Sequence, residues 1–457
     1  MSRNPMTKTV ISDRLTTRMV AGLLALAATT FMALAPVQAA VKIQEVTSEK
    51  GISAWLVEDY TVPIITVRFA FKGGSTQDPD GKDGLATLIS GLFDEGAGEL
   101  EADAFQEKLD EVGAEMGFEA TSDAIYGEMR MLADAKDEAL DLLRLALTSP
   151  RFDQEPVDRI RGQIATRIQR DMRDPNALGR EKFSQALYGE HPYARPSDGT
   201  LETLGSITPD DLKAFHGRLF ARSNISIAVV GAIDAETLGK ELDRVFGELP
   251  EQAEINPVAY VAPRLDQQVD YEYALPQSSI QLVYPGLKRD NSAFFDAFIM
   301  NHILGGGTFS SRLFNEVREK RGLTYGIGSG LITSDFSDSL FIGTSTRADR
   351  VGEALKVIRE EVSRMAQEGP TEEELAKAKT YLVGAYPINN LDSSSAVART
   401  LVELQKEKRG IDYIDKRVGL IEAVTLEGVK AAAQRLLQTE PAILVVGPKQ
   451  AAANNGG

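Results

Sequence analysis

The sequence predicts an α+β protein built from two homologous halves, each a mainly antiparallel sheet covered by helices. The main observation is an internal repeat: SITPDDLKAFHGRLFARSNISIAVVG at 206–231 recurs as AVTLEGVKAAAQRLLQTEPAILVVG at 423–447. Each copy has a helix that begins after a threonine, followed by a buried strand that ends in Val-Val-Gly. Strand and helix patterns alternate within each copy, which indicates a sheet packed against helices.

Two further pairs of segments repeat in the same order and at nearly the same separation. The strand VPIITVRFAF around Ile64 matches SSIQLVYPGL around Ile280, and DQEPVDRIRGQIATRI from Asp153 matches TEEELAKAKTYLVGAY from Thr371. One such match could arise by chance, but three in one order indicate a duplication.

The duplication defines the expected domains. The segment 251–265 is rich in proline and has little helical periodicity, so it is interpreted as a linker. It separates an N-terminal half, 40–250, from a C-terminal half, 266–448. The last residues, 449–457, are expected to be a disordered tail.

Within the N-terminal half, alternating apolar residues predict strands and an apolar residue every three or four positions predicts helices. The expected strands lie near 54–58, 63–71, 124–132 and 225–231. The expected helices lie near 83–95, 103–112, 136–148, 154–172 and 208–219.

Composition excludes several classes of function. The 457 residues carry a net charge of −17, which argues against nucleic acid as a partner because phosphate binding relies on clustered Lys and Arg. The absence of cysteine from the sequence excludes disulfides, thiol nucleophiles and cysteine-ligated zinc. The three histidines, at 191, 216 and 302, fit no short metal-binding motif.

The N-terminus has the pattern of a secretory signal. Arg14 and Arg18 precede the apolar run MVAGLLALAATTFMAL, and small residues follow it. The alternative, a retained membrane anchor, requires ~20 apolar residues, and the run is shorter. The sequence therefore predicts a signal peptide over 1–39, cleaved after Ala39 or Ala40, and a periplasmic mature protein without stable membrane insertion.

The predicted helix 83–95 presents two different faces. Its apolar residues form one core-facing stripe: Leu85, Leu88, Ile89, Leu92 and Phe93. Thr87, Ser90 and Gly91 share the other face. The helix follows an apolar strand that ends in FKGGS and a turn rich in Asp and Gly. This setting closely resembles the insulinase/pitrilysin family of zinc peptidases, which includes the mitochondrial processing peptidases.

The resemblance also shows what this chain lacks. Peptide-cutting members of that family carry His-x-x-Glu-His here, where two histidines bind zinc and the glutamate is the general base. Thr87, Ser90 and Gly91 occupy the positions of the first histidine, the glutamate and the second histidine.

The family's third ligand is a glutamate on a later helix, several residues before an Asp-Pro pair that matches Asp174-Pro175. Arg167 lies near the expected place, and no glutamate occurs between Glu155 and Glu181. Because a catalytic zinc needs three protein ligands, we expect no metal or other cofactor in this chain.

The run GGGTFSSRLFNEVREKRGLTYGIGSG at 305–330 closely resembles the family's second hallmark, a helix ending in Arg followed by Tyr on the next strand. By position, Arg318 and Tyr325 match. The resemblance implies that they contact the substrate carbonyl, here by completing the zinc site of a partner chain. From the residues alone, Arg in a last helical turn and Tyr in a strand are also ordinary structural features.

The strand after this helix alternates glycine with larger residues. Gly326, Gly328 and Gly330 fall on one face, opposite a face that begins with Tyr325 and Ile327. Glycines weaken a strand unless another backbone comes close. That backbone is either a packed helix of the same domain or a bound peptide, so the three glycines are candidate peptide-binding residues.

Two functions remain open. In the first, the chain is the non-catalytic subunit of a heterodimeric zinc metallopeptidase that acts on peptides. Such family members pair as two-chain clamshells, of which this chain would be one half, and the partner subunit would hold the zinc. In the second, the chain is a peptide-binding or scaffold protein with a degenerate peptidase fold and no proteolytic role. Whether the chain takes part in an enzyme depends on which of the two applies.

Overall fold

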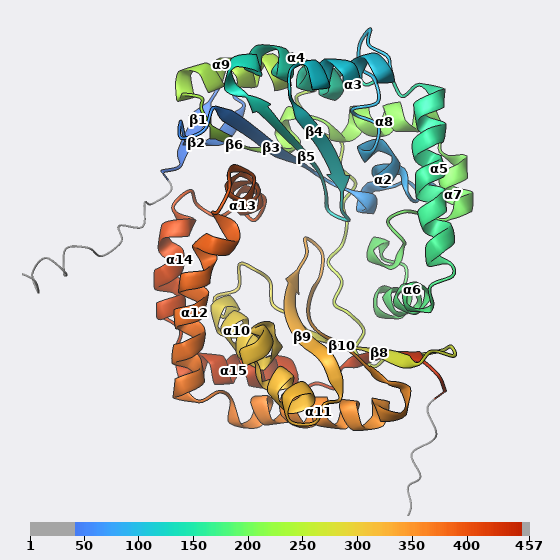
Figure 1. Ribbon diagram of the computed structural model, residues 1–457, viewed down its shortest axis with the longest axis vertical. Coiled ribbons are helices and arrows are strands. Elements are labelled where there is room, and N and C mark those ends of the chain that lie inside the picture. The colour runs from blue at the N-terminus through green and yellow to red at the C-terminus, as the bar shows by residue number, and fades with distance from the viewer. Residues whose placement is uncertain (1–41, 450–457) are drawn as a thin grey trace, which may run out of the picture. The chain divides into compact units, whose positions relative to one another are not determined.

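A computed structural model describes residues 42–449. The predicted signal peptide, 1–39, and the tail after Lys449 lie outside the described residues. The described chain contains a six-stranded and a five-stranded sheet (Figure 1). Within 42–449, none of the helices combines the length and the apolar composition needed to cross a lipid bilayer.

The first sheet has the strand order β1-β2-β6-β3-β5-β4, with β2 and β6 parallel and the other neighbours antiparallel. Its strands are β1 (Gln44–Thr47), β2 (Ser53–Glu58), β3 (Ile64–Lys72), β4 (Glu115–Ala120), β5 (Ala124–Leu132) and β6 (Ile225–Gly231). The helices of this half are α2 (Leu85–Ser90), α3 (Ala102–Glu111), α4 (Lys136–Thr148), α5 (Gln154–Asp171), α6 (Pro175–Tyr188), α7 (Leu201–Ser206), α8 (Pro209–Leu219) and α9 (Ala235–Phe246).

The second sheet has the order β7-β11-β8-β10-β9, with β7 and β11 parallel and the rest antiparallel. Its strands are β7 (Gln268–Glu272), β8 (Gln277–Pro285), β9 (Thr324–Thr333), β10 (Asp338–Arg347) and β11 (Ala442–Gly447). The helices are α10 (Phe294–Asn301), α11 (Val351–Glu368), α12 (Glu372–Asn390), α13 (Ser394–Lys406), α14 (Tyr413–Glu422) and α15 (Leu426–Leu437), with π-helical turns η5 (His302–Gly306) and η7 (Phe314–Glu319).

The two sheets have the same topology. Without the extra edge strand β1, the order β2-β6-β3-β5-β4 corresponds strand by strand to β7-β11-β8-β10-β9, and the parallel pair lies at the same place in both. The repeated segments identified in the sequence form α8 with β6 and α15 with β11. The fold therefore confirms two homologous α+β halves with mainly antiparallel sheets.

The expected helix 83–95 is wrong in its extent, because α2 ends at Ser90. The amide of Gly91 donates to the Leu88 carbonyl oxygen at 3.2 Å, so the helix tightens into a turn there. Leu92 and Phe93 follow in turns but are still fully buried, as the apolar stripe predicts.

Each half has its own core on one face of its sheet. Alternate residues of β3, including Val67 and Phe69, point into the first core, and Leu282 of β8 and Ile342 of β10 point into the second. The opposite face of each sheet is covered only in part, and the sequence does not predict what covers it.

That cover comes from the other half. Helix α6 of the first half packs on β7 and β11, and α13 of the second half packs on β3 and β6 (Figure 1). On the α6 side, Phe183 and Leu187 are buried against Leu444 and Val446. A Cβ atom on Gly179 would collide with Val446, so glycine is needed for this close approach.

On the α13 side, Leu401 and Val402 are fully buried. The side-chain amide of Gln405 forms two hydrogen bonds with the backbone of Ile227 on β6. Its Nε2 donates to the Ile227 carbonyl oxygen at 2.8 Å, and its Oε1 accepts from the Ile227 amide at 3.3 Å. The hydroxyls of Thr66 on β3 and Ser394 on α13 are 2.9 Å apart. Each half thus completes the packing of the other.

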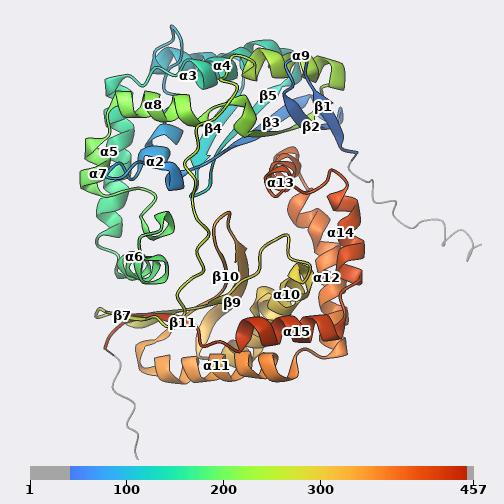
Figure 2. The same cartoon turned by 180° about the vertical axis from the view of Figure 1, so that it is seen from behind.

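The packing of α6 and α13 on the opposite halves predicts the result of cutting the linker, 251–265. The course of the linker is visible in Figure 2. A protease site introduced near Pro257 should give two fragments that stay associated, because α6 and α13 remain buried in the opposite halves. Size-exclusion chromatography of the cleaved protein should show one species of unchanged size. Separation or aggregation of the fragments would contradict this.

Candidate functional site

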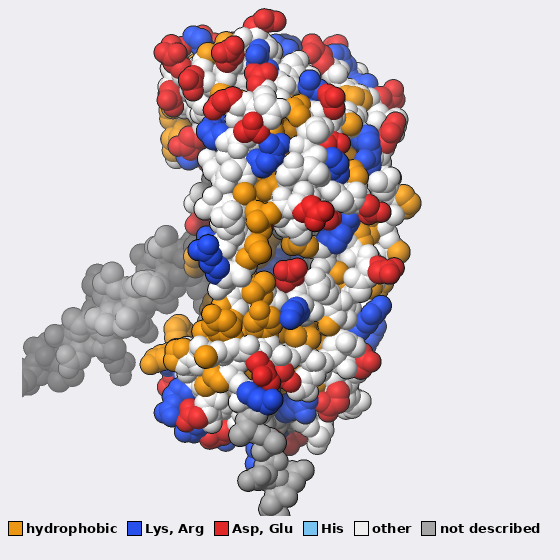
Figure 3. Space-filling view, turned by 90° about the vertical axis from the view of Figure 1, so that its right-hand side faces the viewer, with side chains coloured by type: hydrophobic (Ala, Val, Ile, Leu, Met, Phe, Trp, Pro, Cys, Tyr) orange, Lys and Arg blue, Asp and Glu red, His pale blue; other side chains and the backbone are white. Residues whose placement is uncertain are grey.

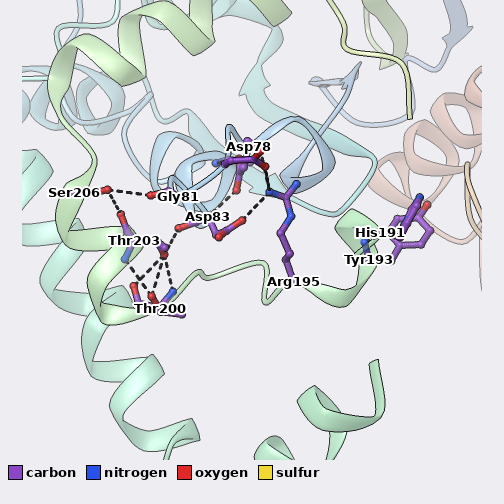
Figure 4. A network of polar contacts seen from close by, with 12 residues as sticks. Asp78, Gly81, Asp83, His191, Tyr193, Arg195, Thr200, Thr203 and Ser206 are labelled. Atoms are coloured by element: carbon purple, nitrogen blue, oxygen red, sulfur yellow. Dashed lines mark hydrogen bonds and ion pairs between the residues drawn. The ribbon is translucent and has the colours of Figure 1, made fainter. Parts of the chain in front are cut away.

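The beginning of α2 is held by a buried carboxylate (Figure 4). Asp78 accepts hydrogen bonds from the amides of Gly84 and Ala86, both at 2.9 Å, and so satisfies two free amides at this helix start. Burial raises the pKa of Asp78 to about 7, although the amides and Arg195 oppose the shift.

The loop preceding α7 and α7 itself pack against the same helix start. Arg195 forms an ion pair with Asp83 at 3.0 Å, and the hydroxyl of Thr203 donates to the Asp83 carbonyl oxygen at 2.9 Å. A Cβ atom on Gly84 would lie 2.5 Å from the Asp198 carbonyl oxygen, and the φ of Gly84 is 98°. Glycine is required here on both grounds.

The three degenerate zinc-motif positions have partners within the chain. The hydroxyl of Thr87 donates to the Ser197 carbonyl oxygen at 2.7 Å, and the hydroxyl of Ser90 donates back to the Thr87 carbonyl oxygen at 2.9 Å. A Cβ atom on Gly91 would lie 2.9 Å from Ile160 Cγ2, which leaves little room for a larger side chain.

Arg167 occupies the region expected for the third ligand and forms a forked ion pair with Asp198. Its Nη2 lies 2.6 Å from Asp198 Oδ1, and its Nε contacts Asp198 Oδ2. Two hydroxyls that donate to carbonyl oxygens, a glycine and a guanidinium do not fit zinc, which requires anionic or imidazole ligands. Throughout residues 42–449, no three His, Asp or Glu side chains are grouped so that they could hold a metal.

The three histidines lie apart and make packing contacts. His216 is stacked on Phe220, and its Nε2 is 2.9 Å from the Leu147 carbonyl oxygen; burial lowers its pKa. His302 is stacked on Tyr381. His191 Nδ1 accepts a hydrogen bond from the amide two residues later in the chain.

A groove of about 820 Å³ lies beside the Arg167–Asp198 pair, between α5, α6 and the segment 194–202, which includes the start of α7. Figure 3 shows the face that carries α5, α6 and α7, on which a band of hydrophobic side chains runs between charges of both signs. Ile168, Met172 and Leu178 contribute apolar surface to the groove. The side chains at the degenerate zinc-motif positions do not line it.

The segment that carries Arg318 is a short helix with a π-helical turn. The helix begins at Ser311, whose hydroxyl accepts from the Phe314 amide at 3.4 Å. The amide of Lys320 donates to the Asn315 carbonyl oxygen at 2.9 Å, five residues back. The π-helical turn ends at Glu319, and the turn that follows closes at Gly322, whose φ is 60° and whose amide donates to the Arg318 carbonyl oxygen at 2.9 Å.

Arg318 has partners only from its own segment among the described residues. It forms an ion pair with its neighbour Glu319, and its guanidinium lies 4.8 Å from the centre of the Phe314 ring. Phe309 packs edge-on against the same ring at 5.0 Å and is 78% exposed. The guanidinium is therefore at the surface, with donors left for another molecule.

Arg312 anchors this helix to the rest of the half. Its Nε and Nη2 each lie 2.7 Å from a carboxylate oxygen of Glu374 on α12, and Nη2 also donates to the Gly369 carbonyl oxygen at 3.0 Å. Its Nη1 is 3.6 Å from Glu361 on α11, which is only 1% exposed. Hydrogen bonds from Arg312 and Thr371 lower the pKa of Glu374 to about 2 against the effect of burial.

A β-bulge sets the position of Tyr325. Thr324 pairs with Thr346 and Ile327 with Thr344, so Tyr325 and Gly326 together oppose the single residue Ser345. The alternation expected from the sequence is therefore wrong at Tyr325, because the extra residue interrupts the period of two. Tyr325 is 89% exposed, whereas Ile327 is buried.

No helix of this domain covers the glycine face of β9 within the described chain. A Cβ atom built on Gly326 or Gly330 would meet nothing within 4 Å, and one on Gly328 would meet only the Gly305 carbonyl oxygen at 3.8 Å. Tyr325, Gly326 and Gly328 line one groove of about 610 Å³, and none of its lining residues is charged. Arg318 and Gly330 are outside this lining.

Sequence reasoning missed the residues that hold the Arg and Tyr in place. Arg312 precedes Arg318 by six positions, but its partners come from α11 and α12, and no local pattern links them. The bulge at Tyr325 also has no local signal beyond the neighbouring Gly326.

Comparisons with known proteins agree with this geometry. The sequence model described as "Insulinase (Peptidase family M16)" matches residues 55–200, and the one described as "Peptidase M16 inactive domain" matches residues 206–382. A Helicobacter pylori protein named "Non-peptidase homolog YmxG" is 26% identical over 75% of this chain and 79% of its own. A Streptomyces coelicolor protein described as an uncharacterized zinc protease is 28% identical over 82% of this chain and 83% of its own.

A crystal structure of a peptidase M16 inactive domain from Pseudomonas fluorescens superposes with a TM-score of 0.84 and 29% identity, covering 90% of this chain and 98% of that one. The duplicated α+β halves define a peptidase-like protein, and its described residues at the zinc-motif positions do not form a metal site. The chain belongs to the M16 insulinase family. The inactive-domain match and the non-peptidase relative fit a non-catalytic role.

Proposed function

We propose that this chain is the non-catalytic subunit of a heterodimeric zinc metallopeptidase that acts on peptides in the periplasm. A homologous partner subunit binds the zinc and supplies the attacking water. This chain lends Arg318 and Tyr325 to the partner's site, where they donate hydrogen bonds to the substrate carbonyl. Gly326, Gly328 and Gly330 form the floor on which the peptide backbone lies.

The observation that carries the proposal is the contrast between the two hallmark sites. Around α2, Thr87, Ser90 and Arg167 all have partners inside the chain. In the second half, Tyr325 is 89% exposed, and within residues 42–449 the guanidinium of Arg318 contacts only Glu319 and Phe314 of its own segment. The zinc-motif positions are therefore used for packing within the chain, whereas the Arg and Tyr side chains remain accessible to a partner's active site.

One observation favours a second candidate, a peptide-binding scaffold without a proteolytic role. The uncharged groove beside Tyr325 and the glycine face can hold an extended peptide whether or not a zinc site faces it. In this case Arg318 and Tyr325 would contribute to binding and not to turnover.

The test is co-purification of the mature chain with a homologue that carries His-x-x-Glu-His, followed by metal analysis. The mature chain alone should contain no stoichiometric zinc, because its positions offer no ligand set, and the complex should contain about one zinc per pair. Stoichiometric zinc in the chain alone would overturn the assignment. Failure to form a complex would favour the scaffold.

A further inference from the structure

The direction of Tyr325 depends on its backbone, because its side chain has little packing of its own. At 89% exposure, the ring has few neighbours that could fix it. Bulges are known to re-aim side chains next to active sites. What holds the bulge in shape therefore decides where the phenol points.

One hydroxyl lies at the centre of the bulge. Oγ1 of Thr324 accepts a hydrogen bond from the Gly326 amide at 3.1 Å. It also lies 2.8 Å from the Gly326 carbonyl oxygen, 2.7 Å from the Ser345 carbonyl oxygen and 2.8 Å from the hydroxyl of Thr344. The hydroxyl of Thr344 in turn donates to the Gly326 carbonyl oxygen at 2.8 Å.

These hydrogen bonds connect the residues on both sides of Tyr325. A hydroxyl carries one proton and two lone pairs, so Thr324 can accept from the Gly326 amide and donate to one carbonyl oxygen at the same time. The residue before Tyr325 is thereby joined to the residue after it and to the opposing strand.

We propose that Thr324, supported by Thr344, is a positioning residue that holds the bulge and so aims Tyr325 at the substrate carbonyl. The inference rests on the proposed function for the role of Tyr325 in turnover. The control of the bulge by Thr324 stands apart from that function and is tested separately.

The simpler explanation is that Thr324 is present because β-branched residues suit strands. Valine has the same shape and the same preference, but it has no hydroxyl. Thr324→Val therefore separates the two explanations, and Thr324→Ser keeps the hydroxyl while removing the branch. Thr333→Val, at the other end of the same strand, is the matched control.

The first measurement is amide hydrogen exchange in the mature chain, followed in a peptide covering residues 323–328. Thr324→Val should speed exchange of the Gly326 amide by roughly threefold to tenfold, the effect of losing one hydrogen bond. Thr324→Ser and Thr333→Val should exchange like the wild type. Unchanged exchange in Thr324→Val, or equal change in Thr333→Val, would overturn the proposal.

The second measurement is peptide hydrolysis by the complex with the zinc-bearing partner. Thr324→Val should lower kcat about tenfold with little change in KM, and Thr324→Ser should restore it, because a misaimed donor weakens the transition state more than substrate binding. If Tyr325→Phe lowers kcat and Thr324→Val does not, the positioning role is wrong. If Tyr325→Phe has no effect, the proposed function fails and the exchange result alone decides whether Thr324 holds the bulge.

Discussion

Replacing Tyr325 with phenylalanine should lower turnover of the complex by about 100- to 1000-fold, the usual effect of removing one donor to a developing oxyanion. The tetrahedral intermediate of peptide hydrolysis carries negative charge on the former carbonyl oxygen, and a phenol is a neutral donor at pH 7. Because Tyr325 is 89% exposed, loss of its hydroxyl changes no packing in the free chain. Steady-state hydrolysis by the co-purified pair measures the effect.

Arg318→Ala should lower turnover of the complex by a similar factor, while assembly of the complex and its zinc content stay unchanged. Arg318→Lys should recover little activity, because a point charge does not replace the planar fork of a guanidinium. Matched controls are Tyr381→Phe, a half-exposed tyrosine on α12, and Arg321→Ala, whose partner Glu316 lies on the same helix. Near-normal rates of peptide hydrolysis from both Arg318→Ala and Tyr325→Phe would contradict the completing role and favour the scaffold function.

Arg312→Ala should destabilise the chain by about 3–5 kcal/mol, because it leaves the buried carboxylate of Glu361 with one ion-pair partner among the described residues, Arg364 at 3.1 Å. The measurement is urea unfolding, compared as the free energy of unfolding. Arg321→Ala removes the same kind of side chain from the turn that follows this helix and should lower the free energy of unfolding by about 1 kcal/mol or less. Equal losses in the two variants would contradict the role of Arg312 as an anchor.

The ion pair between Arg312 and Glu374 has a pH signature. The pKa of Glu374 in the folded chain is about 2, below its ordinary value of 4.5. A lowered pKa contributes stability above pH 4.5, and this stability is lost as the pH falls from 4.5 toward 2. The stability of Arg312→Ala should therefore fall less steeply than that of the wild type over this range.

The sequence predicted the parts of the fold that depend on local pattern. Alternating apolar residues placed β5 and β6 at the observed residues, and the repeat of α8 with β6 identified the duplication. The packing of α6 and α13 against the sheets of the opposite halves was not predicted. An apolar stripe shows that one face of a helix is buried, but it does not show which sheet covers that face. The stripe on 83–95 was buried as expected, yet it could not show that the helix ends at Ser90.

In the candidate site, too, the residues of a local motif could be predicted, whereas contacts between distant segments could not. Thr87, Ser90, Gly91, Arg318 and Tyr325 could be found because a motif places them. The contacts around them join distant segments: Thr87 bonds to Ser197, Arg167 to Asp198 and Arg312 to Glu374. Such pairings leave no trace in a single sequence. The bulge at Tyr325 depends on the pairing of β9 with β10, so the prediction of a simple alternation failed there.

The central claim is that this chain completes a partner's active site, and one titration tests it most directly. Increasing amounts of the mature chain are added to a fixed amount of the zinc-bearing homologue, and hydrolysis of a mixture of quenched fluorescent peptides is followed. The account predicts little activity from either chain alone and a rise that saturates at one copy of each. A partner that is as active alone as in the mixture would contradict it.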